Sequence, residues 1–112
     1  MEGNMGKFEQ IDVTQAKELI GSGNVTIIDI RDSGSYAEAH IHDAIFVNNE
    51  NIEEFLKSAD KSKPLVCYCY HGISSQMAAE YFSEQGFGQV FSMIGGFEQW
   101  RSTHPKEIQT EN

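Results

Sequence analysis

Short apolar runs alternate with amphipathic patterns along the chain. Three runs rich in β-branched residues, VTIIDI (25–30), PLVCYC (64–69) and QVFSMI (89–94), have the length and composition of buried strands. FEQI (8–11) and AIFV (44–47) are two further, shorter candidates. Between these runs the apolar residues recur at helical spacing. The pattern therefore predicts an α/β domain with five strands.

The predicted helices connect these strands. Their apolar positions are Ala16, Leu19 and Ile20 in the first, Ile52, Phe55, Leu56 and Ala59 in the second, and Met77, Ala78, Tyr81 and Phe82 in the third, with SYAEAH (35–40) as a shorter helical piece. Strand, helix, strand connections of this length form right-handed crossovers, which predicts a parallel sheet. The functional loops of such a sheet follow the carboxyl ends of its strands. Residues 70–74 occupy such a position.

The length and composition fit one folded domain. The 112 residues include 39% hydrophobic residues and only two prolines, and they contain no repeat and no linker rich in Pro or Ser. We expect the domain to span residues 7–104. Residues 1–6 are predicted to be disordered or an extension and residues 105–112 a C-terminal tail, whose end IQTEN we expect to be frayed.

The charge balance excludes several classes of partner. Eight basic and 17 acidic residues give a formal net charge of -9, which repels phosphate backbones and anionic membranes. No apolar run approaches the roughly 18 to 20 residues of a membrane span, and the start MEGNMGKFEQ lacks the apolar core of a signal peptide. We therefore expect a cytoplasmic protein that binds neither nucleic acid nor membrane.

A cysteine stands at the end of a predicted strand in VCYCYHGISS (66–75). A short loop separates Cys69 from the predicted helix SSQMAAEYFSEQG, for which Ser74 or Ser75 is the expected N-cap. Loop amides and the helix N-terminus favour the thiolate, which is the nucleophilic form of cysteine. We therefore predict that Cys69 is a nucleophile, the alternative being an inert cysteine at a strand end. Cys67 is expected to pack in the core, and both cysteines to be reduced.

A metal site fits the stretch less well. Cys67, Cys69 and His71 form the pattern C-x-C-x-H. Zinc sites usually combine a wider-spaced cysteine pair with a second, distant pair of ligands, and His40 and His42 do not form a recognisable partner motif. We therefore predict no metal.

A phosphatase loop is the other alternative for a cysteine that follows a strand. Loops of the type C-x(5)-R need their arginine to bind a tetrahedral oxyanion through two hydrogen bonds. Ser75 occupies that position here, and no Lys or Arg occurs in residues 64–100. Phosphoryl transfer therefore lacks its anion-binding group.

Three separated motifs, read in order, point to one family. DIRDSGSYAEAHI (29–41) resembles a D-x-R-x(4)-Y-x-x-G-H-I segment, CYHGISS (69–75) resembles an active-site loop, and GGFEQW (95–100) resembles a closing G-G-F-x-x-W. Together they resemble the rhodaneses, and most closely the bacterial single-domain thiosulfate sulfurtransferases of the GlpE type. The resemblance implies a rhodanese-like three-layer domain with a central, mostly parallel five-stranded sheet flanked by helices.

The resemblance also implies a ping-pong transfer of sulfur. The Cys69 thiolate would attack the outer sulfur of thiosulfate, release sulfite and hold the sulfur as a persulfide, which cyanide or a thiol then removes. The implied partners are thiosulfate, cyanide or small thiols, and thioredoxin-like dithiol proteins. No metal or organic cofactor is implied, and we expect a monomer or a weak dimer.

Further roles around Cys69 follow from the same resemblance. The implied substrate-binding residues are those of the loop, Tyr70, His71, Gly72, Ile73, Ser74 and Ser75. Asp29, Arg31 and Asp32 end or follow a predicted strand, and we expect them to support the site through an ion-pair network rather than to act in catalysis. His71 is expected to face solvent.

Two structural predictions concern the motif GGFEQW (95–100), and one alternative concerns the function. Gly95 and Gly96 are expected to form a strand-to-helix turn, and Trp100 to lie in the core. A sulfur-relay or binding module that keeps Cys69 but delivers sulfur to a protein partner remains open as the alternative function.

Overall fold

A central five-stranded sheet organises the computed structural model, which describes residues 7–110. Its strands are β1 (Glu9–Ile11), β2 (Thr26–Asp29), β4 (Ile45–Phe46), β5 (Leu65–Tyr68) and β6 (Val90–Met93), in the spatial order β1-β6-β5-β2-β4. Every pairing within this sheet is parallel. The strands lie where the apolar runs predict them, so the α/β fold with a parallel sheet is confirmed.

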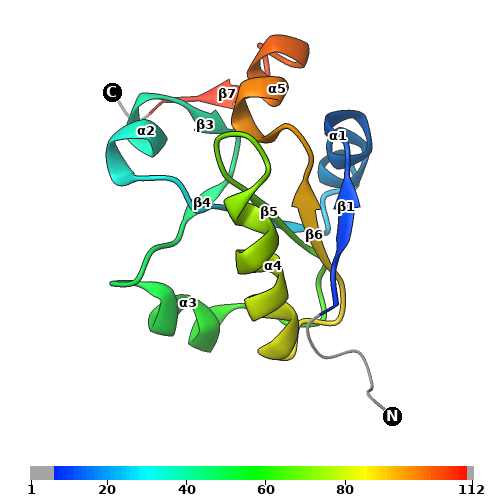
Figure 1. Cartoon of the computed structure of the whole chain (residues 1–112), viewed down its shortest axis with the longest axis vertical. Coiled ribbons are helices and arrows are strands. Elements are labelled where there is room, and N and C mark those ends of the chain that lie inside the picture. The colour runs from blue at the N-terminus through cyan, green and yellow to red at the C-terminus, as the bar shows by residue number, and fades with distance from the viewer. Residues whose placement is uncertain (1–6, 111–112) are drawn as a thin grey trace.

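Helices cover both faces of this sheet. α1 (Val13–Gly21) and α5 (Gly96–Thr103) contribute to a core on one face, whereas α3 (Ile52–Ser58) and α4 (Ser74–Glu84) contribute to a core on the other. Figure 1 shows α4 in front of β5, with α3 on the same side of the sheet. The predicted three-layer architecture is therefore confirmed.

The central strand β5 supplies both cores because successive side chains of a strand point to opposite faces. Val66 and Tyr68 pack on the side of α1 and α5, and Leu65 and Cys67 pack on the side of α3 and α4. All four are fully buried, as predicted for Cys67. The alternation places Cys69, directly after the strand, on the side of α4.

A capping box fixes the start of α1. The Asp12 carboxylate accepts a hydrogen bond from the Gln15 amide at 2.8 Å, and the Gln15 side chain accepts one from the Asp12 amide at 3.0 Å. Val13 and Ala16 then lie one turn apart on the buried face. The apolar spacing and the cap together determine where this helix begins and how it faces the sheet.

A second, small sheet pairs two segments that are far apart in the sequence. β3 (His40–Ile41) lies antiparallel to β7 (Ile108–Gln109), near α2 (Ser33–Glu38) and α5 at one end of the molecule (Figure 1). The prediction that IQTEN is frayed is wrong for its first two residues, whose backbone groups find partners in β3. The helical piece predicted at SYAEAH ends earlier than expected, because His40 lies in β3.

Two further predictions concern the chain as a whole. Among residues 7–110, no helix is long and apolar enough to cross a membrane. The extension predicted at residues 1–6 and the last two residues of the predicted tail lie outside the described residues. The domain boundaries therefore remain predictions.

Candidate active site

The carboxyl ends of β2 and β5 lie side by side. Their parallel register pairs Asp29 with Tyr68, the last residue of each strand. Arg31 and Asp32 follow the first of these, and Cys69 follows the second. The structure thus brings the residues predicted to support the site to the same edge of the sheet as the cysteine loop, where parallel sheets carry their functional loops.

Two fixed backbone amides point at the Cys69 sulfur. The N–H groups of Gly72 and Ser75 each donate to it at 3.2 Å. Ser75 lies in the first turn of α4, where an amide has no carbonyl partner within the helix. Cys69 is only 3% exposed, so water competes little for its sulfur. These donors can therefore stabilise a thiolate without rearrangement.

The two cysteines differ in acidity because their surroundings differ. Burial raises the pKa of Cys69, but hydrogen bonds from the hydroxyls of Ser74 and Ser75 and from the amides of Ser75 and Gly72 outweigh burial and lower this pKa to about 7. Burial, and to a smaller extent the proximity of Cys69, raises the pKa of Cys67 far above its ordinary value. At neutral pH the loop therefore holds a substantial fraction of Cys69 as thiolate, whereas Cys67 remains a thiol.

The prediction that Ser74 or Ser75 caps α4 is wrong. The helix begins at Ser74, and the residue before it is Ile73, which makes no side-chain cap. Ser74 and Ser75 are therefore the first two helical residues, and their hydroxyls act on the Cys69 sulfur. The sulfur accepts an amide hydrogen bond that a capping oxygen would otherwise accept.

The N-terminus of α5 holds the first carbonyl groups of the loop. The Phe97 amide donates to the Cys69 carbonyl oxygen at 2.8 Å, and the Glu98 amide donates to the Tyr70 carbonyl oxygen at 3.1 Å. Gly96 allows this close approach, because a Cβ there would overlap the Tyr70 carbonyl group. The sequence predicted a turn at the glycine pair but not its support of the loop. A double glycine at the start of a helix was the available signal for close backbone contact.

Gly72 turns the loop back toward the sulfur. Its φ is 89°, in the left-handed region that favours glycine. A Cβ here would lie 2.8 Å from the Gly95 nitrogen and 2.9 Å from the Met93 carbonyl oxygen. The Gly72 carbonyl oxygen accepts a hydrogen bond from Gln76 Nε2 at 2.9 Å, which fixes the turn from the side of α4. The position therefore requires glycine for both its conformation and its space.

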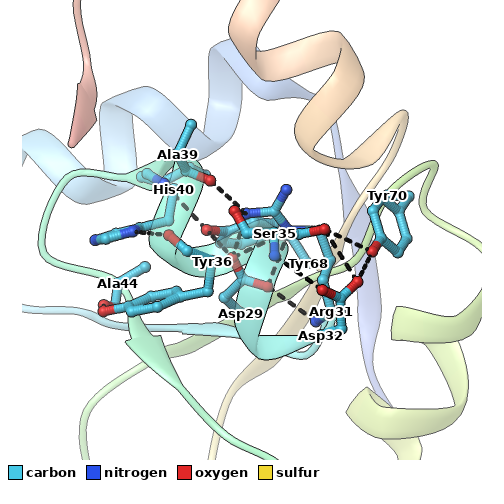
Figure 2. Close-up of polar contacts among 11 residues, drawn as sticks. Asp29, Arg31, Asp32, Ser35, Tyr36, Ala39, His40, Ala44, Tyr68 and Tyr70 are labelled. Atoms are coloured by element: carbon cyan, nitrogen blue, oxygen red, sulfur yellow. Dashed lines mark hydrogen bonds and ion pairs between the residues drawn. The ribbon is translucent and has the colours of Figure 1, made fainter. Parts of the chain in front are cut away.

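A buried ion pair lies beside Tyr68 (Figure 2), whose side chain packs on the opposite face of β5 from Cys67. Arg31 Nη2 lies 2.7 Å from Asp29 Oδ2, and Arg31 Nε donates to both carboxylate oxygens at 3.1 Å. The Tyr68 hydroxyl also donates to Asp29 Oδ2, at 2.7 Å. Arg31 Nη2 further donates to the Ala39 carbonyl oxygen at 2.6 Å, and the guanidinium lies 4.2 Å from the centre of the Phe97 ring. These contacts tie β2, β5 and the segment after α2 together.

Asp32 does not join this ion pair but caps α2. Its carboxylate accepts hydrogen bonds from the Ser35 amide at 2.8 Å and the Ser35 hydroxyl at 3.0 Å. The Tyr70 hydroxyl also donates to this carboxylate and lies 2.8 Å from the Ser35 hydroxyl oxygen (Figure 2). Hydrogen bonds from Tyr70 first, and then from Ser35, lower the pKa of Asp32 to about 2. The predicted network is thus divided into two clusters, of which the second connects the loop to α2.

Four loop side chains are exposed next to the sulfur-binding turn, those of Tyr70, His71, Ile73 and Ser74. His71 is among them, whereas Cys67 is buried, so the residues of the pattern C-x-C-x-H lie in different environments. Within residues 7–110, no group of three or more His, Cys, Asp or Glu side chains is arranged to hold a metal ion. The substrate-binding roles of the loop residues remain predictions.

The sequence of this chain matches a known protein family over most of its length. The family model described as the rhodanese-like domain matches residues 12–103. This chain belongs to the rhodanese family. The matched range contains all three motifs from which the rhodanese resemblance was inferred, so that prediction is confirmed.

Relatives of similar length support the same rhodanese assignment. A protein of Coxiella burnetii (strain RSA 331) named thiosulfate sulfurtransferase GlpE is 44% identical over 105 residues, covering 94% of this chain and 98% of the relative. A protein of Pseudomonas fluorescens (strain SBW25) with the same name is 46% identical over 108 residues, covering 96% and 98%. The crystal structure of a rhodanese-like domain protein from Staphylococcus aureus has a TM-score of 0.77 at 23% identity, covering 94% of this chain and all of that one. This structural likeness supports the rhodanese fold.

Proposed function

We propose that this protein is a thiosulfate sulfurtransferase that carries sulfur on Cys69. Its curated relatives bear that name, and the loop has the properties that the chemistry needs. The pair of amides that donate to the Cys69 sulfur at 3.2 Å is the observation that carries the assignment. Together with a pKa of about 7, these donors make Cys69 the nucleophile.

The reaction divides into two balanced half-reactions. The Cys69 thiolate attacks the outer sulfur of thiosulfate, a new sulfur–sulfur bond forms, and sulfite leaves with the electron pair of the bond that breaks. Cyanide then attacks the outer sulfur of the persulfide, thiocyanate leaves, and the thiolate returns. The cycle needs no cofactor, because every electron pair is supplied by a reactant or by Cys69.

The loop suits both half-reactions. The thiolate and the persulfide are both anions at nearly the same place, so the same amides and hydroxyls can stabilise both without moving. We assign the contacts with thiosulfate to the exposed residues of the loop that holds the sulfur, Tyr70, His71, Ile73 and Ser74. Asp29, Arg31 and Asp32 then act only as supports.

Phosphatase activity has less support. Ser75, which stands where a phosphatase loop has arginine, is fully buried, and its surroundings leave no room for a longer side chain without rearrangement. Arg31 is engaged by Asp29 and by the Ala39 carbonyl oxygen. A phosphate group would therefore lack a guanidinium partner in this loop.

Steady-state kinetics tests the main proposal. Initial rates measured over a grid of thiosulfate and cyanide concentrations should give parallel double-reciprocal lines, because sulfite leaves before cyanide reacts. Thiosulfate alone should release one sulfite for each Cys69. Intersecting lines, or no sulfite without cyanide, would contradict the persulfide mechanism.

One observation favours a protein acceptor as a second candidate. Ile73 and Met77 are 75% and 76% exposed and lie one helical turn apart beside the loop. Exposed apolar side chains that lie together often bind a partner protein. We therefore propose that thioredoxin-like dithiol proteins accept sulfur in addition to small thiols. A cytoplasmic location and a monomeric or weakly dimeric state are hypotheses that accompany this one.

A variant at Met77 tests the protein acceptor. Met77→Ser should raise the KM for a thioredoxin-like acceptor about fivefold and leave the KM for cyanide unchanged, because cyanide needs no docking surface. Ile45→Ser is the matched control, since Ile45 is also exposed but lies on the edge strand β4. Equal KM values for the protein acceptor in both variants would exclude docking at Met77.

A further inference from the structure

Two buried hydroxyl groups lie beneath the Cys69 loop. Ser75 Oγ on α4 and Ser92 Oγ on β6 are 2.7 Å apart, and both residues are fully buried. Ser92 reaches this place because the parallel register pairs it with Cys67, which directs its side chain to the face of the sheet that α4 covers. The pair therefore lies behind the turn of α4 that binds the sulfur.

A serine at position 92 needs an explanation, because the core between the sheet and α4 is otherwise apolar. Its members include Cys67, Ala79 and Val90. A hydroxyl group in such surroundings is unfavourable unless it is hydrogen-bonded, whereas an alanine would leave nothing to satisfy. The hydrogen bond with Ser75 satisfies the Ser92 hydroxyl. We therefore look for the reason for the pair in the other group that Ser75 contacts, which is the Cys69 sulfur.

The number of protons sets the direction of these hydrogen bonds. A serine hydroxyl has one proton to donate. The Ser75 amide donates to the Cys69 sulfur at 3.2 Å, and the Ser75 hydroxyl is among the groups that lower the pKa of that cysteine. When Ser75 donates its proton to the sulfur, the 2.7 Å contact with Ser92 requires the Ser92 proton.

We propose that Ser92 is a positioning residue for sulfur transfer, because its hydroxyl donates to Ser75 and thereby directs the Ser75 hydroxyl to the Cys69 sulfur. The two hydrogen bonds point the same way, so each polarises the next. Ser92 does not act on the sulfur itself. The inference rests on the proposed role of Cys69, but it can be tested with a reaction that needs no thiosulfate.

The titratable groups around the loop bear on any pH measurement. On the elements packed against it they are Cys67 and Tyr68 on β5, Tyr70 and His71 in the loop, Glu80, Tyr81 and Glu84 on α4, Glu98 and Arg101 on α5, and Asp32, which accepts a hydrogen bond from Tyr70, with the Asp29 and Arg31 pair next to it. β6, with the sequence VFSM, contributes none. Burial raises the pKa values of Cys67 and Tyr68, so both stay neutral over the range tested. An exchange at residue 92 removes no charge and leaves the direct effect of all these groups on the sulfur in place.

The test is the pH dependence of Cys69 alkylation by iodoacetamide in Ser92→Ala, with the labelled residue located by mass spectrometry. The midpoint should rise, so that the rate constant at about pH 6 falls roughly twofold to threefold, while the limiting rate at high pH stays the same. Ser92→Thr keeps the hydroxyl and should restore the original midpoint. An unchanged midpoint in Ser92→Ala would leave Ser92 with a packing role only. A lowered midpoint would mean that Ser75 donates to Ser92 in the wild type, and either result overturns the proposal.

A double-mutant cycle shows whether Ser92 acts through Ser75. Ser75→Ala should slow alkylation at about pH 6 roughly tenfold, and adding Ser92→Ala should have no further effect. Ser74→Ala is the matched control, because the exposed Ser74 hydroxyl also lowers the pKa of Cys69, whereas the hydroxyl that contacts Ser92 is that of Ser75. In that background Ser92→Ala should keep its full effect. An effect of equal size in both backgrounds would show that Ser92 does not act through Ser75. Ser92→Val, which has the shape of the threonine variant but no hydroxyl, should repeat the raised midpoint if the alanine variant is poorly folded.

Discussion

Two polar clusters lie at the same edge of the sheet, and they hold negative charge in different ways. In one, the Arg31 guanidinium pairs directly with the Asp29 carboxylate at 2.7 Å. In the other, the Cys69 sulfur accepts hydrogen bonds from neutral amides and hydroxyls. The first uses a full opposite charge and the second uses dipoles only.

This difference explains why one cluster suits support and the other suits reaction. A cation beside a carboxylate fixes it in place, which is useful for holding β2 against β5. The nucleophilicity of a thiolate falls as its pKa falls, and the best attacking thiol has a pKa near the ambient pH. Dipoles lower the pKa of Cys69 only to about 7. A cation in their place would give more thiolate but a less reactive one.

The largest expected effect distinguishes the two cysteines of β5 and its loop. Cys69→Ser should abolish persulfide formation while the fold is retained, because a serine alkoxide is too basic to form and accept sulfur. Cys67→Ser should still turn over but should lose about 1–3 kcal/mol of unfolding free energy if the buried hydroxyl lacks a partner. Mass spectrometry after thiosulfate treatment should find about 32 Da, one sulfur atom, on Cys69 in the Cys67→Ser protein. A sulfur gained by the Cys69→Ser protein would overturn the assignment.

Breaking the ion pair should affect stability more than chemistry. Arg31→Met leaves the Asp29 carboxylate buried without its cation and should lower the unfolding free energy by about 3–5 kcal/mol in urea titrations. The matched control is Arg101→Met, since Arg101 forms an exposed pair with Glu98 at 3.3 Å and its loss should cost less than about 1 kcal/mol. Equal losses in the two variants would show that the buried pair has no special role in the fold.

Distorting the loop backbone should affect sulfur transfer more than stability. Gly72→Ala forces a Cβ against the Gly95 nitrogen and the Met93 carbonyl oxygen and should move the Gly72 amide away from the sulfur. We expect sulfur transfer to fall about tenfold or more, together with a higher pKa of Cys69. Gly88→Ala is the control, because a Cβ there meets no atom within 4 Å. Activity that is unchanged in Gly72→Ala would mean that the loop amides do not stabilise the reacting anion.

The smallest effect is a pair of opposite pH dependences of stability. The pKa of Cys69 is lower in the folded than in the unfolded chain, so its stabilising contribution is present above the unfolded value of about 8.5 and is lost as the pH falls through about 7. The pKa of Cys67 is raised, so its contribution is present below about pH 8.5 and declines above it. Relative to Cys69→Ala, the wild type should gain stability between about pH 6 and 9, and relative to Cys67→Ala it should lose stability above about pH 8.5. Urea unfolding at several pH values measures both slopes, and slopes of the same sign would contradict the assigned environments.

Local sequence signals were sufficient for most of the sheet and for the choice of Cys69. β-branched apolar runs predicted the three inner strands β2, β5 and β6, because a strand buried on both faces must be apolar at almost every position, and shorter apolar runs predicted the edge strands β1 and β4. Cys69 was identifiable because a strand, a short loop and a helix follow one another without a gap in the chain. The small sheet of β3 and β7 could not be predicted in this way, since Ile41 and Ile108 are far apart in the sequence and are paired only by the tertiary structure.

The sequence by itself determined the chain order of the main-sheet strands and of the helices between them, the family, and the position of the reactive cysteine, because each depends on residues close together in the chain or on motifs. Only the tertiary structure decided which groups surround and hold the loop that carries the sulfur. Ser92 on β6 and the N-terminal amides of α5 reach the loop through strand register and helix packing, which no local pattern records. It also decided that Ile73 precedes α4 and that the Ser75 amide serves Cys69, because an orphan amide of a helix binds whichever acceptor the fold places in front of it.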